Sequence, residues 1–189
     1  ASELEVKFDK EYILEKKVDI KKEISIIITR FLNNDFIIYE PIDNFHVNQM
    51  LSRSTIPADI DNAISEKALQ QAKLIAEKLN YIGTMCVEYF IDKKDNLFVN
   101  EIAPRVHNSG HLTINTHNVS QFENHIRAVC NLEKVNLKKI NNAEMINIIG
   151  EEIKTYREKL YSKDEFFFDY LKSEIKEKRK MGHLTIIKP

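Results

Sequence analysis

The spacing of apolar residues divides the chain into predicted strands and helices. Short apolar runs rich in β-branched and aromatic residues predict strands at 12–15, 23–30, 36–40, 145–150, 165–170 and 183–187. Apolar residues at helical spacing predict helices over 58–79 and 119–132, and a charged helix is expected over 151–160. The helix over 119–132 is amphipathic through Phe122, Ile126 and Val129. The order of these strands and helices along the chain predicts an α+β fold with a mostly antiparallel sheet and flanking helices.

Two carboxylates stand in or directly after apolar runs that follow each other along the chain. Glu88 lies within the apolar run 85–91, and Glu101 follows the strand-like residues 97–99 after a turn at 92–96. A lone charge buried in a strand is costly, so it needs a partner. We expect two adjacent strands, each presenting one carboxylate to a shared metal ion.

Composition narrows the class of protein. The chain has 189 residues, 43% of them hydrophobic and 30% charged, which indicates a folded, soluble protein. A formal net charge of −1 does not indicate the basic surface with which proteins bind nucleic acids or membranes. Cys86 and Cys130 lie in apolar segments without metal spacing, so we expect reduced core cysteines in a cytoplasmic protein. No apolar run approaches the ~20 residues of a membrane span, and a signal peptide is not expected.

Glycine is scarce, and this affects how a nucleotide could be held. The chain has four glycines and lacks a glycine-rich phosphate loop of the Walker or dinucleotide type. Any phosphate-gripping loop is therefore built differently or lies outside this chain. The two ends of the sequence also suggest one part of a larger polypeptide.

The densest chemistry lies in the twelve residues from 100 to 111. They include a carboxylate, two amides, a guanidinium and two imidazoles. A carboxylate beside an amide suits Mg²⁺ and phosphate oxygens, whereas Arg with His and Asn suits a small anion. This segment predicts a site for a metal, a phosphate and an anion together.

Four segments together resemble the C-terminal half of the ATP-grasp domain. More narrowly, they resemble the 5-(carboxyamino)imidazole ribonucleotide synthases, a family of ATP-dependent ligases in bacterial and fungal purine biosynthesis. The segments are the adenine-hinge-like 13–25, the short stretch 44–46, the motif 100–111 with Glu88 upstream, and the phosphate-binding-like pair 170–174 and 179–183. The resemblance implies the C-terminal part of an ATP-grasp domain over 1–135 and a small β-rich subdomain over 136–189. The family's N-terminal domain and lid subdomain are absent from this chain.

The resemblance also implies roles for individual residues. ATP would be held by Glu15, Lys16, Lys17, Val18, Glu23, His46, Asn100 and Glu101. Mg²⁺ would be bound by Glu88 and Glu101. Bicarbonate and carboxyphosphate would be clamped by Arg105, His107 and Asn108, and the ribonucleotide phosphate by Lys172 and Arg179.

Some of these residues have plain alternatives on the sequence alone. Glu15 and Glu23 would otherwise be solvated charges at strand edges, and 176–180 a solvated turn. His46, on a loop or an edge strand, could equally be a bystander. Structural roles are expected for His111, His117, His125 and His183.

The implied function is the ATP- and bicarbonate-dependent carboxylation of the exocyclic amine of aminoimidazole ribonucleotide through carboxyphosphate. ATP and Mg²⁺ would be required, in a homodimeric enzyme that binds neither nucleic acid nor membrane. One alternative is formate-dependent glycinamide ribonucleotide formyltransferase, whose motif tends to carry Asp-Thr-Gly-Met at positions 108–111. Another is a catalytically incomplete nucleotide-binding or oligomerisation module.

Overall fold

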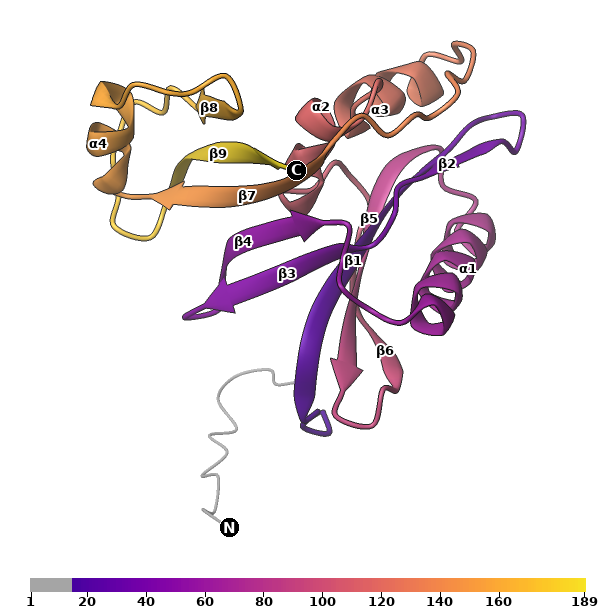
Figure 1. The fold of residues 1–189 in the computed structure, drawn as a ribbon. Coiled ribbons are helices and arrows are strands. Elements are labelled where there is room, and N and C mark those ends of the chain that lie inside the picture. The colour runs from indigo at the N-terminus through magenta and orange to yellow at the C-terminus, as the bar shows by residue number, and fades with distance from the viewer. Residues whose placement is uncertain (1–14) are drawn as a thin grey trace, which may run out of the picture.

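A single nine-stranded antiparallel sheet forms the frame of the molecule in the computed structural model, which describes residues 15–189 (Figure 1). Its strands are β1 Ile20–Arg30, β2 Phe36–Ile38, β3 Ile42–Val47, β4 Met50–Ile56, β5 Gly83–Asp92, β6 Leu97–Ala103, β7 Asn142–Ile149, β8 Glu165–Asp169 and β9 Lys180–Lys188. Their order is β6-β5-β1-β3-β4-β7-β9-β8, and β2 forms a hairpin with β1. The predicted α+β class with an antiparallel sheet is confirmed.

The helices are short and flank the sheet. They are α1 Asn62–Lys78, α2 Thr113–Thr116, α3 Gln121–Val129 and α4 Glu152–Glu158, with a 3₁₀ turn η1 at Ser109–Leu112. In α1, Ala68, Ala72 and Ala76 recur every four residues and are almost fully buried. These small side chains let the helix lie close to the sheet. No helix among residues 15–189 is long and apolar enough to cross a membrane.

Strand alternation gives β1 two different faces. Ile24, Ile26 and Ile28 point into the core beneath α1. The intervening positions face the other side of the sheet, where Ile27 packs with Cys86 of β5. Glu23 and Ser25 share this second face, so β1 carries polar groups toward the site described below.

The strands β3 and β4 were not predicted. Their polar residues do not suggest a core strand. Asn44 and Ser54 are nevertheless almost fully buried, and the hydrogen bond between them offsets the cost of burying these polar groups. His46 was expected on a loop or an edge strand, and this is wrong: β3 lies between β1 and β4. Of the strand expected at 12–15, Glu15 belongs to no strand and the other residues lie outside the described part of the chain.

The helix α3 presents the opposite face from the one its amphipathic pattern suggests. Phe122, Ile126 and Val129 are 37%, 55% and 50% exposed. The buried positions are instead Gln121, Asn124 and Ala128. The two buried amides find partners inside, since Asn124 Nδ2 donates to Tyr39 Oη at 2.7 Å. Cys130, directly after this helix, is also exposed, which corrects the prediction that it lies in the core.

The last part of the chain has its own small core but shares the sheet. Ile148, Ile153, Met181 and Leu184 form this cluster between α4 and the strands β7 and β9. The pairing of β4 with β7 joins these strands to the rest of the sheet. A division near residue 135 remains a prediction.

Candidate functional site

A β-bulge places an amide and two carboxylates beside one another. Glu88 of β5 pairs with Glu101 of β6, whereas the next residue, Tyr89, pairs with Val99. Asn100 is therefore an extra residue in β6. Such a bulge interrupts the alternation of the strand and re-aims its side chains. As a result Asn100 and Glu101, although adjacent in sequence, both line the same cavity as Glu88.

This cavity of about 720 Å³ gathers residues from distant parts of the chain. The carboxylates and amide of β5 and β6 form one wall. A second, basic wall consists of residues before and at the start of β9, namely Lys172, Lys178, Arg179 and Lys180. Eight of the predicted site residues line the cavity: Glu23, His46, Glu88, Asn100, Glu101, His107, Lys172 and Arg179. Within it, the Glu23 carboxylate lies 2.8 Å from His46 Nδ1.

The remaining predicted residues do not line this cavity. Residues 15–18 precede β1, with Glu15, Lys16 and Lys17 exposed. Arg105 is exposed and its guanidinium donates to the Val106 carbonyl at 3.0 Å. The Asn108 amide turns toward β7 and exchanges two hydrogen bonds with Asn147, of 3.0 and 2.6 Å.

The electrostatics of the acidic wall suit a cation. Burial, together with the neighbouring Glu101 carboxylate, raises the pKa of Glu88 to about 7. Glu88 is partly buried and Glu101 is exposed beside it, so the two carboxylates repel each other, and a divalent cation removes that repulsion. Carboxylate and amide oxygens are the ligands that Mg²⁺ prefers. The donor set of Glu88, Glu101 and Asn100 therefore fits Mg²⁺.

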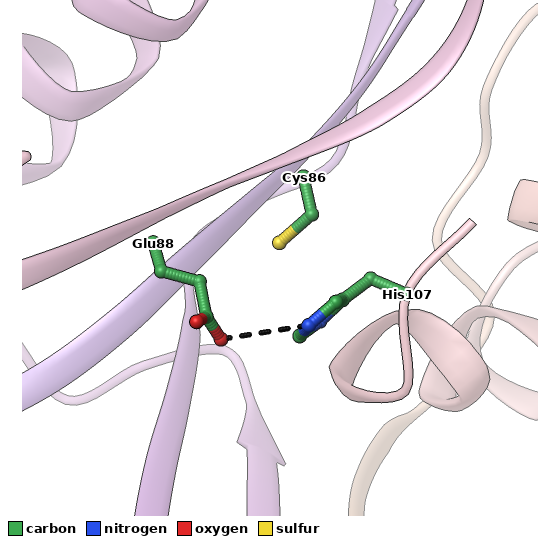
Figure 2. A group of neighbouring side chains, drawn as sticks. All are labelled: Cys86, Glu88 and His107. Carbon is green, nitrogen blue, oxygen red and sulfur yellow. Dashed lines mark ion pairs between the residues drawn. The ribbon is translucent and has the colours of Figure 1, made fainter. Parts of the chain in front are cut away.

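A second group of potential metal ligands is less suitable. Figure 2 shows Cys86, Glu88 and His107 pointing toward one another, with their ligand atoms within 4.8 Å. Burial raises the pKa of the Cys86 thiol, so the thiolate that a metal ion binds would be costly to form there. Burial also lowers the pKa of His107 to about 4, so its ring is neutral near pH 7. The 3.7 Å contact from His107 Nε2 to Glu88 Oε1 is thus not an ion pair at that pH.

Lys180, which the sequence analysis missed, is the most buried lysine of the basic wall. Burial lowers its pKa, and the nearby Lys172 acts in the same direction. Its Nζ donates to Asn108 Oδ1 at 3.2 Å, and its carbonyl accepts from Lys172 Nζ at 2.5 Å. In the sequence Lys180 stands in a basic run that resembles a solvated turn. Its position at the start of the apolar strand β9 was the available signal.

The loop that carries His107 is held by the side chain of Gln121, which sequence reasoning also missed. Gln121 is fully buried, its Oε1 accepts from the His107 N–H at 3.0 Å, and its Nε2 donates to the His107 carbonyl at 2.6 Å. Nε2 also lies 3.2 Å from His111 Nδ1. Gly110 lies directly against Gln121, with no room for a side chain. His111 itself packs among the rings of Phe122, Tyr170 and His183.

Known proteins are similar to this chain in both sequence and fold. Residues 1–122 match the family model described as the ATP-grasp domain, and residues 143–189 match the phosphoribosylaminoimidazole carboxylase C-terminal domain. The chain is 40% identical over 177 residues to the N5-carboxyaminoimidazole ribonucleotide synthase of Bacillus subtilis (strain 168). That alignment covers 93% of this chain and 47% of the relative, so the chain spans about half the length of the curated relatives it matches.

Solved structures agree with the sequence matches. The N5-carboxyaminoimidazole synthetase from Staphylococcus aureus complexed with ADP is 39% identical, with a TM-score of 0.85, over 92% of this chain and 48% of that one. The synthase from Aspergillus clavatus in complex with ADP and 5-aminoimidazole ribonucleotide is 28% identical, with a TM-score of 0.86 and the same coverage. Since the first family match extends over more than half of the 189 residues, the chain belongs to the ATP-grasp family.

Proposed function

We propose that this chain is the metal- and substrate-binding half of an ATP-dependent carbon–nitrogen ligase. The reaction would carboxylate the exocyclic amine of aminoimidazole ribonucleotide through carboxyphosphate, in de novo purine biosynthesis. The observation that carries the proposal is the cavity with Glu88, Asn100 and Glu101 on one wall and Lys172, Arg179 and Lys180 on the other. The ADP and ribonucleotide in the Aspergillus clavatus complex support it.

The acidic wall would bind the metal and the nucleotide phosphates. Phosphoryl transfer depends on charge neutralisation and on in-line positioning more than on a protein nucleophile. Glu88 and Glu101 would hold Mg²⁺, which neutralises phosphate charge when bound, and Asn100 would supply a neutral oxygen. Glu23 and His46, at the same cavity, would face the ribose, while residues 15–18 would meet the adenine through backbone groups.

The centre of the cavity would hold bicarbonate. His107 lies there in a neutral form, and a neutral imidazole can hydrogen-bond an anion without first losing or gaining a proton. Arg105 and Asn108 belong to the same loop and would complete the clamp. Asn108 would first have to exchange its amide pairing with Asn147 for the substrate. Arg105, which is exposed, would have to turn inward.

The basic wall would bind the 5′-phosphate of the ribonucleotide. Lys172 and Arg179 lie on the segment before β9 and line the same cavity as the proposed metal ligands. Arginine offers two parallel donors to a phosphate, and lysine adds a compact charge. The amine of the ribonucleotide would then lie between its anchored phosphate and the carboxyl donor.

We further propose that a domain boundary near residue 135 separates the ATP-grasp part from a small C-terminal subdomain. The intact enzyme would be a homodimer located in the cytoplasm.

Calorimetric titration of the chain with ADP, in MgCl₂ and in EDTA, tests the metal site. Glu88→Gln and Glu101→Gln should abolish the Mg²⁺-dependent part of the affinity, because each removes a charged ligand. Glu123→Gln, an exposed carboxylate on α3, is the matched control and should bind like the parent chain. Equal binding by all variants would refute the metal assignment.

Turnover tests the reaction itself. ADP release should require bicarbonate and aminoimidazole ribonucleotide when the chain is mixed with the N-terminal half of the Bacillus subtilis relative. Formate with glycinamide ribonucleotide in place of these substrates should give no turnover. Turnover with formate would instead support the formyltransferase, and a mixture that binds nucleotide without any turnover would support a non-catalytic module.

A further inference from the structure

A buried chain of hydrogen bonds runs from the middle of the sheet to the ring of His107. It begins at Ser54 of β4 and passes through Asn44 of β3 and Ser25 of β1 to Ser109 of η1. Ser54 Oγ lies 2.8 Å from Asn44 Oδ1, Asn44 Nδ2 3.0 Å from Ser25 Oγ, and Ser25 Oγ 2.8 Å from Ser109 Oγ. Ser109 Oγ lies 2.9 Å from His107 Nδ1. The four members before the histidine are at most 5% exposed.

The donors along this chain all point toward the histidine. Ser54 donates to the amide oxygen of Asn44, which leaves the Asn44 NH₂ group to donate to Ser25. Ser25 in turn donates to Ser109. A hydroxyl has one proton to give, and Ser109, which accepts from Ser25, keeps its own proton available for His107 Nδ1.

A second, longer contact favours the same direction. The backbone N–H of Ser109 also points at His107 Nδ1, at 3.4 Å. A backbone N–H can only donate, so Nδ1 must be an acceptor and carry no proton. In a neutral imidazole the remaining proton then resides on Nε2. That nitrogen is the one facing Glu88 and the cavity (Figure 2).

We propose that Ser109, with Ser25 and Asn44 behind it, is a positioning residue that fixes His107 as the Nε2–H tautomer. Resting on the proposed function, this tautomer makes His107 a neutral hydrogen-bond donor to an oxygen of bicarbonate or carboxyphosphate. It also excludes two other roles for the same ring. A nitrogen that carries a proton cannot ligate a metal, and it cannot accept a proton from the ribonucleotide amine.

The tautomer can be read directly by NMR, without any substrate. In the histidine-¹⁵N-labelled chain near pH 7, the protonated and unprotonated ring nitrogens have separate shifts and different couplings to the ring C–H protons. We expect His107 to show an unprotonated Nδ1 and a protonated Nε2. An Nδ1–H tautomer in the parent chain would overturn the proposal, whatever the variants do.

Variants test the positioning step. Ser109→Ala removes the hydroxyl donor at 2.9 Å and leaves only the longer backbone contact at 3.4 Å, so it should populate the Nδ1–H tautomer in part. Ser109→Thr keeps a hydroxyl and should retain the parent pattern. Ser25→Ala breaks the chain one step earlier and should act in the same direction. Thr29→Val is the matched control, because Thr29 is a buried hydroxyl on β1 that pairs with Thr84 instead. An unchanged His107 pattern in Ser109→Ala would refute the role of Ser109.

Kinetics in the reconstituted mixture separates the two proposals. Ser109→Ala should lower kcat for bicarbonate-dependent ADP release by roughly 10- to 100-fold, the usual cost of losing a group that orients a functional histidine, with little change in the KM for ATP. A variant that changes tautomer yet keeps its kcat would refute the donor role. If the parent mixture shows no bicarbonate-dependent turnover, the proposed function fails, while the NMR result still decides the tautomer.

Discussion

Replacing Gly110 by alanine should loosen the loop that carries His107. A Cβ atom at this position would lie 2.4 Å from Gln121 Oε1, 2.6 Å from its Cδ and 2.9 Å from its Nε2. These distances are far below normal contact, so the Gln121 amide has to move. Gly110 is not among the residues with positive φ, so the backbone itself accepts alanine and the clash is the main cost.

The size of the effect follows from the hydrogen bonds that Gln121 would lose. Its amide makes two to the backbone of His107 and one to His111 Nδ1. Each buried hydrogen bond contributes about 0.5–1.5 kcal/mol, and groups left unsatisfied cost more. We expect Gly110→Ala to lower the free energy of unfolding by about 2–4 kcal/mol. With an m-value of about 2 kcal/mol/M, the urea midpoint should fall by about 1–2 M.

Urea denaturation followed by far-UV circular dichroism measures this change, and a double-mutant cycle tests its cause. Gln121→Ala removes the clashing amide, so adding Gly110→Ala to it should cost less than about 0.5 kcal/mol. The second substitution could even stabilise slightly, because alanine restricts the unfolded chain. If Gly110→Ala cost the same 2–4 kcal/mol with and without Gln121, the steric reasoning would be refuted.

Three further predictions concern pH, α3 and Lys180. Burial lowers the pKa values of four histidines to about 3 or 4, so the unfolded chain binds their protons first and stability should fall as pH drops from about 6.5 toward 4. The raised pKa of Glu88 should increase stability over the same fall in pH, but Glu88 is one group against four histidines. Urea midpoints at about pH 7 and pH 5 measure the net change in stability. In α3, Ile126→Ala should lower the free energy of unfolding by less than about 1 kcal/mol, because Ile126 is exposed. Ala128→Leu should lower it by about 1–3 kcal/mol, because the larger side chain overpacks the core. Thermal unfolding measures both changes. Lys180→Met should weaken binding of ribose 5-phosphate by about tenfold or more in calorimetry, and Lys176→Met, at an exposed position, should not.

The acidic wall could be predicted because its two carboxylates come from neighbouring segments of the sequence. Glu88 and Glu101 lie on consecutive strands joined by a short turn, and neighbouring strands in such a hairpin place opposite residues side by side. An apolar run that contains a carboxylate is a visible anomaly in the sequence. The bulge was not visible, because nothing in the local pattern distinguishes Asn100 as an extra residue.

What the sequence could not reveal depends on partners far away in the chain. Asn44 resembles a loop residue until Ser25 and Ser54 are placed beside it. Likewise the apolar stripe of α3 suggests a buried face. The helix turns the other way because Gln121 bonds to the loop at His107 and Asn124 to Tyr39, 85 residues earlier. Periodicity measures hydrophobicity along one segment and contains no information about such distant donors and acceptors.

The bulge at Asn100 also limits how this protein can change in length. An insertion or deletion in the turn between β5 and β6 leaves both strands in register, so the turn can vary. One residue removed from β6 would abolish the bulge: Glu101 could still pair with Glu88 and its neighbour with Tyr89, but no second side chain would stand beside Glu101 at the cavity. The length of β6 is therefore fixed by the need for the bulge, and we expect natural variants to differ in the turn rather than in the strand.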